Sequence, residues 1–87
     1  SPRCTIIDVF AHDKPGLLYT ATRTIFKLGL SVMLAKISTH LDQVVDVFYV
    51  TDANGEKVED GERLRHVRDP LFETIQEFER TGYLQFQ

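Results

Sequence analysis

The chain has 87 residues, of which 43% are hydrophobic and 26% charged, and its formal net charge is -3 at pH 7. This length and composition are typical of one globular domain with a single small core, and they argue against a disordered chain. The charge pattern gives no basic footprint for nucleic acid, and no apolar run approaches the roughly 18 residues of a membrane span, so we expect neither partner.

The cysteine and histidine content argues against a disulfide within the chain and against a metal site. The single cysteine, Cys4, cannot form a disulfide within the chain, which favours a reducing, cytoplasmic compartment. His12, His40 and His66 lack metal-ligand spacing, so we expect no metal and no cofactor. Because the chain begins Ser-Pro-Arg, with no initiator methionine and no targeting segment, we expect it to be a piece of a longer protein.

Two elements are predicted before residue 30. Residues 4–11, CTIIDVFA, are rich in β-branched and aromatic side chains and run into an Asp-Lys-Pro-Gly breaker, which indicates a strand followed by a turn. From Pro15 to Leu28 apolar residues recur every three or four positions. This spacing predicts a helix with Pro15 in its first position and Gly29 at its end.

A hairpin is predicted next. Two strand-like runs, 30–41 and 44–52, are separated by the short polar break Asp42-Gln43. Alternation within the first run is imperfect, because its first half marks one face as apolar and its second half marks the other. A β-bulge near 34–36 would reconcile the two halves.

A second helix is predicted over residues 61–80, after a polar loop with an Asn-Gly turn signal. Pro70 lies inside the apolar stripe without shifting its phase, which favours one kinked helix; the alternative is two helices, the second beginning at Asp69-Pro70. Gly82 is predicted to end the helix, and residues 83–87 alternate as a short strand.

The resulting order, βαββαβ, predicts an α+β protein of the ferredoxin-like class. We expect a four-stranded antiparallel sheet, in the order 4-1-3-2, with two helices on one face. Residues 1–87 would form a single domain with its core beginning at about residue 4. This fold serves many functions, so the function has to be argued from a site.

The sheet face that points away from the helices is predicted to be apolar. Strict alternation assigns to this open face Ile6, Phe10, Val44, Phe48 and Val50. The alternate positions of both strands are assigned to the core. An apolar face of this kind is typical of an interface, here with a second copy of the chain or with a sibling domain.

The turn before the first helix has two interpretations. As a plain turn, Asp13 would accept a backbone N–H and Pro15 would start the helix. As a ligand site, the N–H groups of Gly16, Leu17 and Leu18 would bind a carboxylate, and Asp13 would bind an ammonium group. The second interpretation fits an α-amino acid.

The segments DKPGLLYTATRTIFKLGLSVMLAKIST and VVDVFYVTDANGEKV resemble an ACT domain, the small amino-acid-sensing module of metabolic enzymes. The D-x-P-G-L-L turn is shared by ACT domains broadly. The pairing of AKIST with VDVFYVTD most resembles the C-terminal ACT domain of bifunctional PII uridylyltransferase/uridylyl-removing enzymes. The resemblance covers about residues 5–80.

This resemblance implies a ligand at the interface of two ACT domains, touching the turn and the start of the second strand. On this chain it implicates Asp13, Gly16 and Leu17 in the turn, and Ser31 and Val32 on the strand; an asparagine often used in such sites is absent, with Asp13 and Ser31 in its place. It also implies a glutamine effector, a role in nitrogen metabolism through the PII signal protein, and a nucleotidyltransferase parent in which this part is not catalytic. The alternatives are a ligand-free dimerisation domain and the ACT domain of another enzyme of amino-acid metabolism.

Other site types have less support in the sequence. We expect Lys36 and Asp46 to form a cross-strand ion pair on the outer sheet face rather than to bind a ligand. An acylphosphatase-like enzyme would need an arginine in the loop after the first strand, where only Lys14 is present. An RNA-binding sheet would carry basic residues beside its aromatic ones, whereas Asp8 and Asp46 occupy those positions here.

Overall fold

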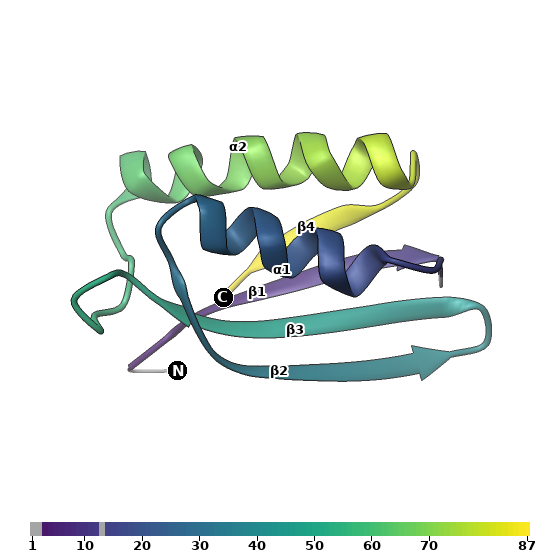
Figure 1. Cartoon of the computed structure of the whole chain (residues 1–87), viewed down its shortest axis with the longest axis horizontal. Coiled ribbons are helices and arrows are strands. Elements are labelled where there is room, and N and C mark those ends of the chain that lie inside the picture. Colours follow the sequence, from purple (N-terminus) through teal and green to yellow (C-terminus); the bar gives the residue numbers. More distant parts are fainter. Residues whose placement is uncertain (1–2, 13) are drawn as a thin grey trace.

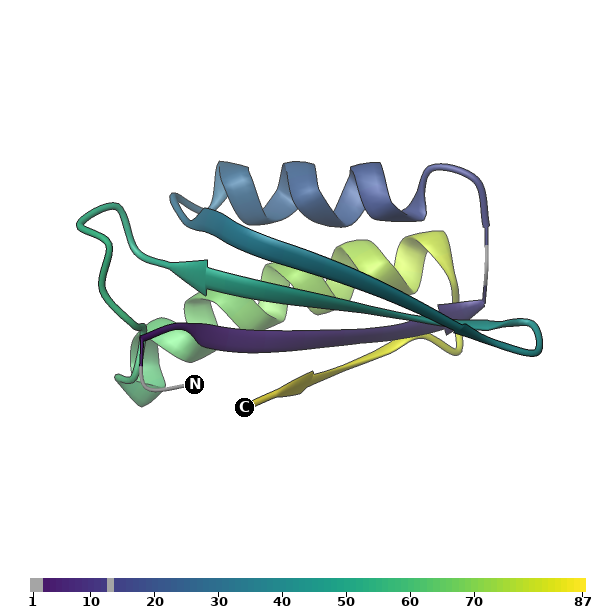
Figure 2. The ribbon, with the colours of Figure 1, turned by 90° about the horizontal axis from the view of Figure 1, so that it is seen from below.

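The computed structural model describes residues 3–12 and 14–87 and confirms the predicted order of elements. The elements are β1 (Thr5–His12), α1 (Leu17–Lys27), β2 (Ser31–His40), β3 (Gln43–Thr51), α2 (Gly61–Phe78) and β4 (Tyr83–Phe86). The sheet is antiparallel with the order β2-β3-β1-β4, as expected for the ferredoxin-like fold. Both helices cover one face of this sheet (Figures 1 and 2), and the other face is open. Within the described residues, neither helix is long and apolar enough to span a bilayer.

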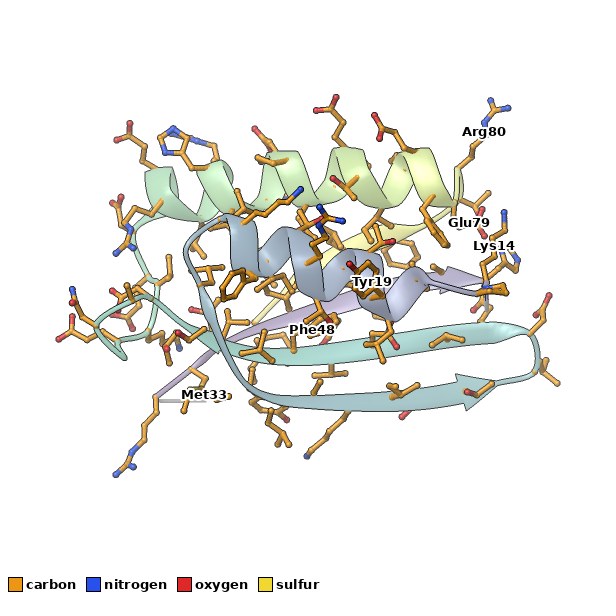
Figure 3. All side chains as sticks on the ribbon, in the orientation of Figure 1. Lys14, Tyr19, Met33, Phe48, Glu79 and Arg80 are labelled. Atoms are coloured by element: carbon orange, nitrogen blue, oxygen red, sulfur yellow. The ribbon has the colours of Figure 1, made fainter. Side chains whose placement is uncertain are left out.

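The core lies between the helices and the two central strands, β1 and β3. Its fully buried side chains include Ile7, Ile25, Phe48, Leu71 and Ile75, which come from both strands and both helices. The apolar stripes of the helices meet the sheet here because their positions repeat with the helical period. Figure 3 shows Phe48 beneath α1, at the centre of this layer.

The register between β1 and β3 corrects the predicted faces of β3. Ile7 pairs with Phe48, and Thr5 pairs with Val50. Directly paired residues of an antiparallel sheet point to the same face, so Phe48 and Val50 lie under the helices with Ile7. Val44 is buried on that side as well. The prediction that Val44, Phe48 and Val50 face away from the helices is therefore wrong: β3 is apolar on both faces, and alternation does not say which face the helices cover.

The open face keeps the two predicted residues of β1. Ile6 and Phe10 are half-buried there, and the ring of Phe10 stacks on Tyr83 of β4 with their centroids 4.5 Å apart. The residues of β3 that share this face with them are Val45, Val47 and Tyr49. The open face is thus apolar, as predicted, but it is built from the other half of β3.

The beginning of α1 differs from the prediction. The helix starts at Leu17, and Gly16 is its N-cap with φ +86°, a left-handed conformation that a glycine adopts without steric cost. Pro15 therefore lies before the helix and not in its first position. The turn ends two residues later than the helical spacing indicates, since the left-handed residue is part of the turn.

The second helix runs unbroken through Pro70, so the one-helix prediction is confirmed and the two-helix alternative is not. Its N-cap, Asp60, accepts the backbone N–H of Arg63 at 3.2 Å. The helix ends at Phe78, before Gly82. A Cβ at Gly82 would lie 2.8 Å from Ile75 Cγ2, so the missing side chain lets the chain turn closely past α2 into β4.

The β-bulge in β2 is confirmed, although it lies slightly earlier than predicted. The register against β3 shifts between Val32 and Leu34, so Met33 is the extra residue. After this shift, Leu34 and Lys36 point to the open face, while Ala35 and Ile37 point to the helix side. This explains the imperfect alternation of the strand in the sequence.

Candidate ligand-binding site

A cavity of about 520 Å³ lies between the start of α1 and the helix side of β2 and β3. Its volume is within the roughly 300–1,000 Å³ that is usual for small-molecule sites. The lining residues are Lys14, Pro15, Gly16, Leu17, Leu18, Tyr19, Ile37, Thr39, Val44 and Asp46. Figure 3 shows Tyr19 on α1 and Lys14 just beyond the start of that helix.

The cavity exists because α1 leaves one end of the outer strand uncovered. The helix runs antiparallel to β2, so its first turn lies near the last residues of that strand (Figure 1). Ile37 and Thr39 pair with Asp46 and Val44, and the four side chains form the sheet wall of the cavity. Ile37 is 55% exposed, although it points to the helix side, because β2 is an edge strand.

The turn itself is closed by its own backbone. The N–H of Leu17 donates to the carbonyl oxygen of Lys14 at 3.2 Å, and the N–H of Thr20 donates to the carbonyl oxygen of Gly16 at 2.9 Å. The N–H of Leu17 therefore has a partner within the turn, and its role in binding a ligand carboxylate stays a prediction. A Cβ on Gly16 would point toward the ring of Phe78, at 3.7 Å, so this glycine also meets α2.

The predicted site residues are only partly brought together. Gly16, Leu17 and Leu18 line the cavity, and Asp13 lies outside the described residues. Ser31 and Val32 pair with Thr51 and Val50 at the opposite end of β2, and they do not line this cavity. Their meeting with a turn across an interface between two domains stays a prediction.

Asp46 is the residue that sequence reasoning misplaced. It lies on the helix side, lines the cavity and is only 2% exposed. Lys36 pairs with Val47, so it points to the open face, where its Nζ lies 5.3 Å from the centroid of the Tyr49 ring. The predicted ion pair between Lys36 and Asp46 is therefore wrong, for the same reason that the faces of β3 were inverted.

One signal in the sequence marks Asp46, since it is the sole charged residue in the run VVDVFYV. Burial of a charged side chain within a strand that is apolar on both faces lowers the stability of the fold unless the charge is paired. A functional role is one reason why such a residue would be present. Ile37 and Thr39 carry no comparable signal. They line the cavity only because of the bulge in β2 and the position of α1.

A buried carboxylate anchors the residue that precedes the turn. Glu79, just after α2, accepts the backbone N–H of His12 at 3.2 Å and also contacts the Nδ1 atom of its ring. Its other oxygen accepts the backbone N–H of Thr81 at 3.2 Å. The Thr81 hydrogen bond, followed by that of the His12 ring, lowers the pKa of Glu79 to about 2. Glu79 and Lys14 lie at the same end of the molecule (Figure 3), and Glu79 links the end of β1 to the residues that follow α2.

The cavity offers chemistry for a small organic ligand. It combines apolar walls with one buried carboxylate, Asp46, and one exposed ammonium group, Lys14. The positive end of the α1 dipole adds to the charge of Lys14. Among residues 3–12 and 14–87, no cluster of three or more His, Cys, Asp or Glu side chains is arranged to hold a metal ion.

Comparison with known families decides what kind of domain this is. The model of the "ACR family N-terminal ACT domain" matches residues 1–78. The chain belongs to the ACT-domain family. The position of an ACT domain within its protein is not fixed by this match, so the expected C-terminal position stays a prediction.

Curated relatives of this ACT domain are bifunctional uridylyltransferase/uridylyl-removing enzymes. The protein of Azospirillum brasilense is 42% identical over 71 residues, which cover 82% of this chain and 8% of the relative. The protein of Novosphingobium aromaticivorans is 42% identical over 77 residues, which cover 88% of this chain and 8% of the relative. The chain thus spans about 8% of the length of these relatives.

A solved structure confirms the fold of the ACT domain. An ACT domain protein from Streptococcus pneumoniae superposes with a TM-score of 0.75, covering 95% of this chain and 85% of that chain. The two sequences are 18% identical, so the likeness concerns the fold alone.

Proposed function

We propose that this ACT domain is the amino-acid-sensing regulatory domain of a bifunctional uridylyltransferase/uridylyl-removing enzyme, and that its effector is glutamine. The similarity to such enzymes over most of the chain supports the choice of parent. The observation that carries the sensing role is the cavity of about 520 Å³ at the turn before α1. The proposal places the domain in the cytoplasm, where the parent would modify the PII signal protein in nitrogen metabolism.

The cavity suits the parts of an amino acid. The Lys14 ammonium group and the start of α1 would attract a carboxylate. Leu17 and Ile37 would contact the aliphatic part of the side chain, and the hydroxyl of Thr39 would hydrogen-bond a terminal amide. Glutamine has all three features.

Binding at this position would reach the helix layer directly. His12, just before the turn, contacts Glu79, and Gly16 in the turn faces Phe78 of α2. A ligand that shifts the turn would therefore also displace the end of α2. We propose that this displacement reaches the catalytic part of the parent enzyme through the contact of this domain with a second ACT domain. In this proposal the chain itself performs no catalytic step.

A second candidate function, dimerisation without a ligand, is favoured by the open sheet face. Its exposed or half-buried apolar residues span all four strands: Leu34, Tyr49, Val47, Val45, Ile6, Phe10 and Tyr83. Sedimentation of the chain and of Tyr49→Glu would show whether this face mediates pairing. Pairing that Tyr49→Glu abolishes, together with no response to any amino acid, would favour this candidate over sensing.

The sensing role can be tested by filling the cavity. Ile37→Trp introduces an indole at the cavity wall at little cost in stability, because Ile37 is exposed. The matched control is Leu34→Trp, which lies on the same strand but on the opposite face and is 48% exposed. We expect calorimetry to show glutamine binding to the wild type and to Leu34→Trp, with affinity at least about 10-fold lower for Ile37→Trp.

Three results would contradict parts of the proposal. No binding of glutamine or of any other amino acid to the wild-type chain would contradict sensing. Binding of a different amino acid alone would contradict glutamine as the effector. Equal affinity of the two tryptophan variants would contradict this cavity as the site.

A further inference from the structure

β4 forms one edge of the sheet and pairs with β1 on its inner side (Figure 2). Gln87, directly after β4, exchanges both backbone hydrogen bonds with Ile6 of β1, at 2.8 and 3.1 Å. Because the backbone groups of successive strand residues point in opposite directions, those of Leu84 and Phe86 point away from β1, toward the free edge. This edge can therefore pair with a further strand.

A row of α2 side chains lies along the free edge of β4. The row consists of residues at four-residue spacing, which share one side of a helix: Leu64, Arg68, Phe72 and Gln76. Both ends of the row contact the chain on either side of β4. Leu64 lines a cavity of about 240 Å³ together with Phe86, and the side-chain N–H of Gln76 donates to the carbonyl oxygen of Gly82. Since β4 runs back along α2 (Figure 1), Arg68 and Phe72 lie between these contacts, beside the edge.

The row combines an apolar surface with positive charge. Phe72 is 41% exposed, and Arg68 and its neighbour Arg65 are exposed as well. Within the described part of the chain, neither guanidinium group forms an ion pair, even though Asp69 follows on the same helix. Two guanidinium groups without a partner favour a ligand that carries carboxylates.

The other edge of the sheet is less suited to strand addition. β2 is longer than β4, but its ladder is interrupted by the bulge at Met33, a feature that disfavours pairing at an edge. The ammonium group of Lys36 in β2 lies over the ring of Tyr49. β4 pairs without a register shift, but its four residues offer few backbone groups. Binding at β4 would therefore depend on the α2 row as well as on the backbone.

We propose that the free edge of β4 and the α2 row form a docking surface for an extended acidic segment of a partner protein. The segment adds a strand to the sheet through backbone hydrogen bonds to Leu84 and Phe86. Its carboxylates pair with Arg65 and Arg68, and an apolar side chain covers Phe72. This surface is separate from the cavity at the start of α1, so the inference goes beyond the proposed sensing function.

The test uses two capped heptapeptides, one with alternating valine and glutamate and one with lysine in place of each glutamate. Each is titrated into the 87-residue chain, and amide hydrogen exchange and chemical shifts are followed by NMR. We expect an excess of the acidic peptide to slow exchange at Leu84 and Phe86 by about 10-fold or more, because strand addition hydrogen-bonds these amides. The lysine peptide should bind at least about 10-fold more weakly.

A pair of charge-reversal variants tests the arginine contact. Arg68→Glu should lose the preference for the acidic peptide. The matched control is Arg23→Glu, which changes the net charge equally at an exposed position of α1. We expect Arg23→Glu to keep the preference of the wild type, since α1 does not flank β4.

The outcomes are exclusive. Protection of Leu84 and Phe86 by the acidic peptide, lost in Arg68→Glu but kept in Arg23→Glu, supports the inference. Protection confined to β2, no protection of any edge amide, or equal affinity for the two peptides overturns it. Protection of Leu84 and Phe86 that rises with protein concentration in the absence of peptide also overturns it, because a second copy would then occupy the edge. None of these outcomes bears on amino-acid binding at the cavity.

Discussion

The two faces of the sheet use similar residues for different purposes. Each face has aromatic and β-branched side chains and one buried aspartate, Asp46 on the helix side and Asp8 on the open side. On the open side, Gln87 of the same chain hydrogen-bonds Asp8. On the helix side, Asp46 lines a cavity that α1 leaves over β2. The role of the one charged residue in an apolar strand therefore depends on which face of the sheet that residue occupies.

The largest expected effect tests this assignment of faces on two adjacent residues. Phe48 is 0% exposed beneath the helices, and Tyr49 is half-buried on the open side. We expect Phe48→Ala to lower the free energy of unfolding by about 3–5 kcal/mol, because it leaves a cavity in the core. Tyr49→Ala should lower the free energy of unfolding by only about 1 kcal/mol, through lost cross-strand contacts. Urea unfolding measures both; the opposite order would show that β3 is inverted.

A smaller effect concerns the carboxylate that fixes the turn to the helix layer. The pKa of Glu79 is about 2 in the folded chain, below its usual value of 4.5, so its ionised form stabilises the fold. This contribution is fully present above pH 4.5 and is lost as the pH falls toward 2. We expect Glu79→Gln to be less stable than the wild type at pH 6, and the difference to shrink steadily between pH 4.5 and pH 3.

Thermal unfolding across this pH range measures the contribution of Glu79. The control is Glu73→Gln, an exposed acid on α2, which should track the wild type at every pH. A constant difference between Glu79→Gln and the wild type from pH 6 to pH 3 would mean that the charge of Glu79 does not anchor His12 and Thr81.

The smallest effect concerns the open face alone. Lys36 lies over the ring of Tyr49, and a partly exposed contact of this kind contributes about 0.5–1 kcal/mol. Lys36→Ala should therefore reduce the free energy of unfolding by no more than about 1 kcal/mol and should leave glutamine affinity unchanged. Lys27→Ala, at the exposed end of α1, is the control for loss of a surface charge. A loss of glutamine affinity in Lys36→Ala would place the ligand on the open face.

Local patterns predicted the elements of the fold closely. The strands and helices differ from their predicted bounds by no more than two residues, and the bulge in β2 was visible as a break in alternation. The continuation of α2 through Pro70 was predicted from the unbroken phase of its apolar stripe, whereas the cap at Asp60 was not predicted. Of the residues predicted to bind a ligand, Gly16, Leu17 and Leu18 of the local turn motif line the cavity, and their binding role stays a prediction.

The sequence alone therefore determined the order of the elements, the ferredoxin-like class and the turn at the start of α1. These depend on the periodicity of side chains and on the conformational preferences of glycine and proline, which act within a few residues. Only the tertiary structure decided which face of β3 is covered, that Glu79 contacts His12 from 67 residues away, and that Asp46 faces the cavity. The reason is that these contacts depend on strand register and helix position, and a strand that is apolar on both sides fits either arrangement until its neighbours are in place.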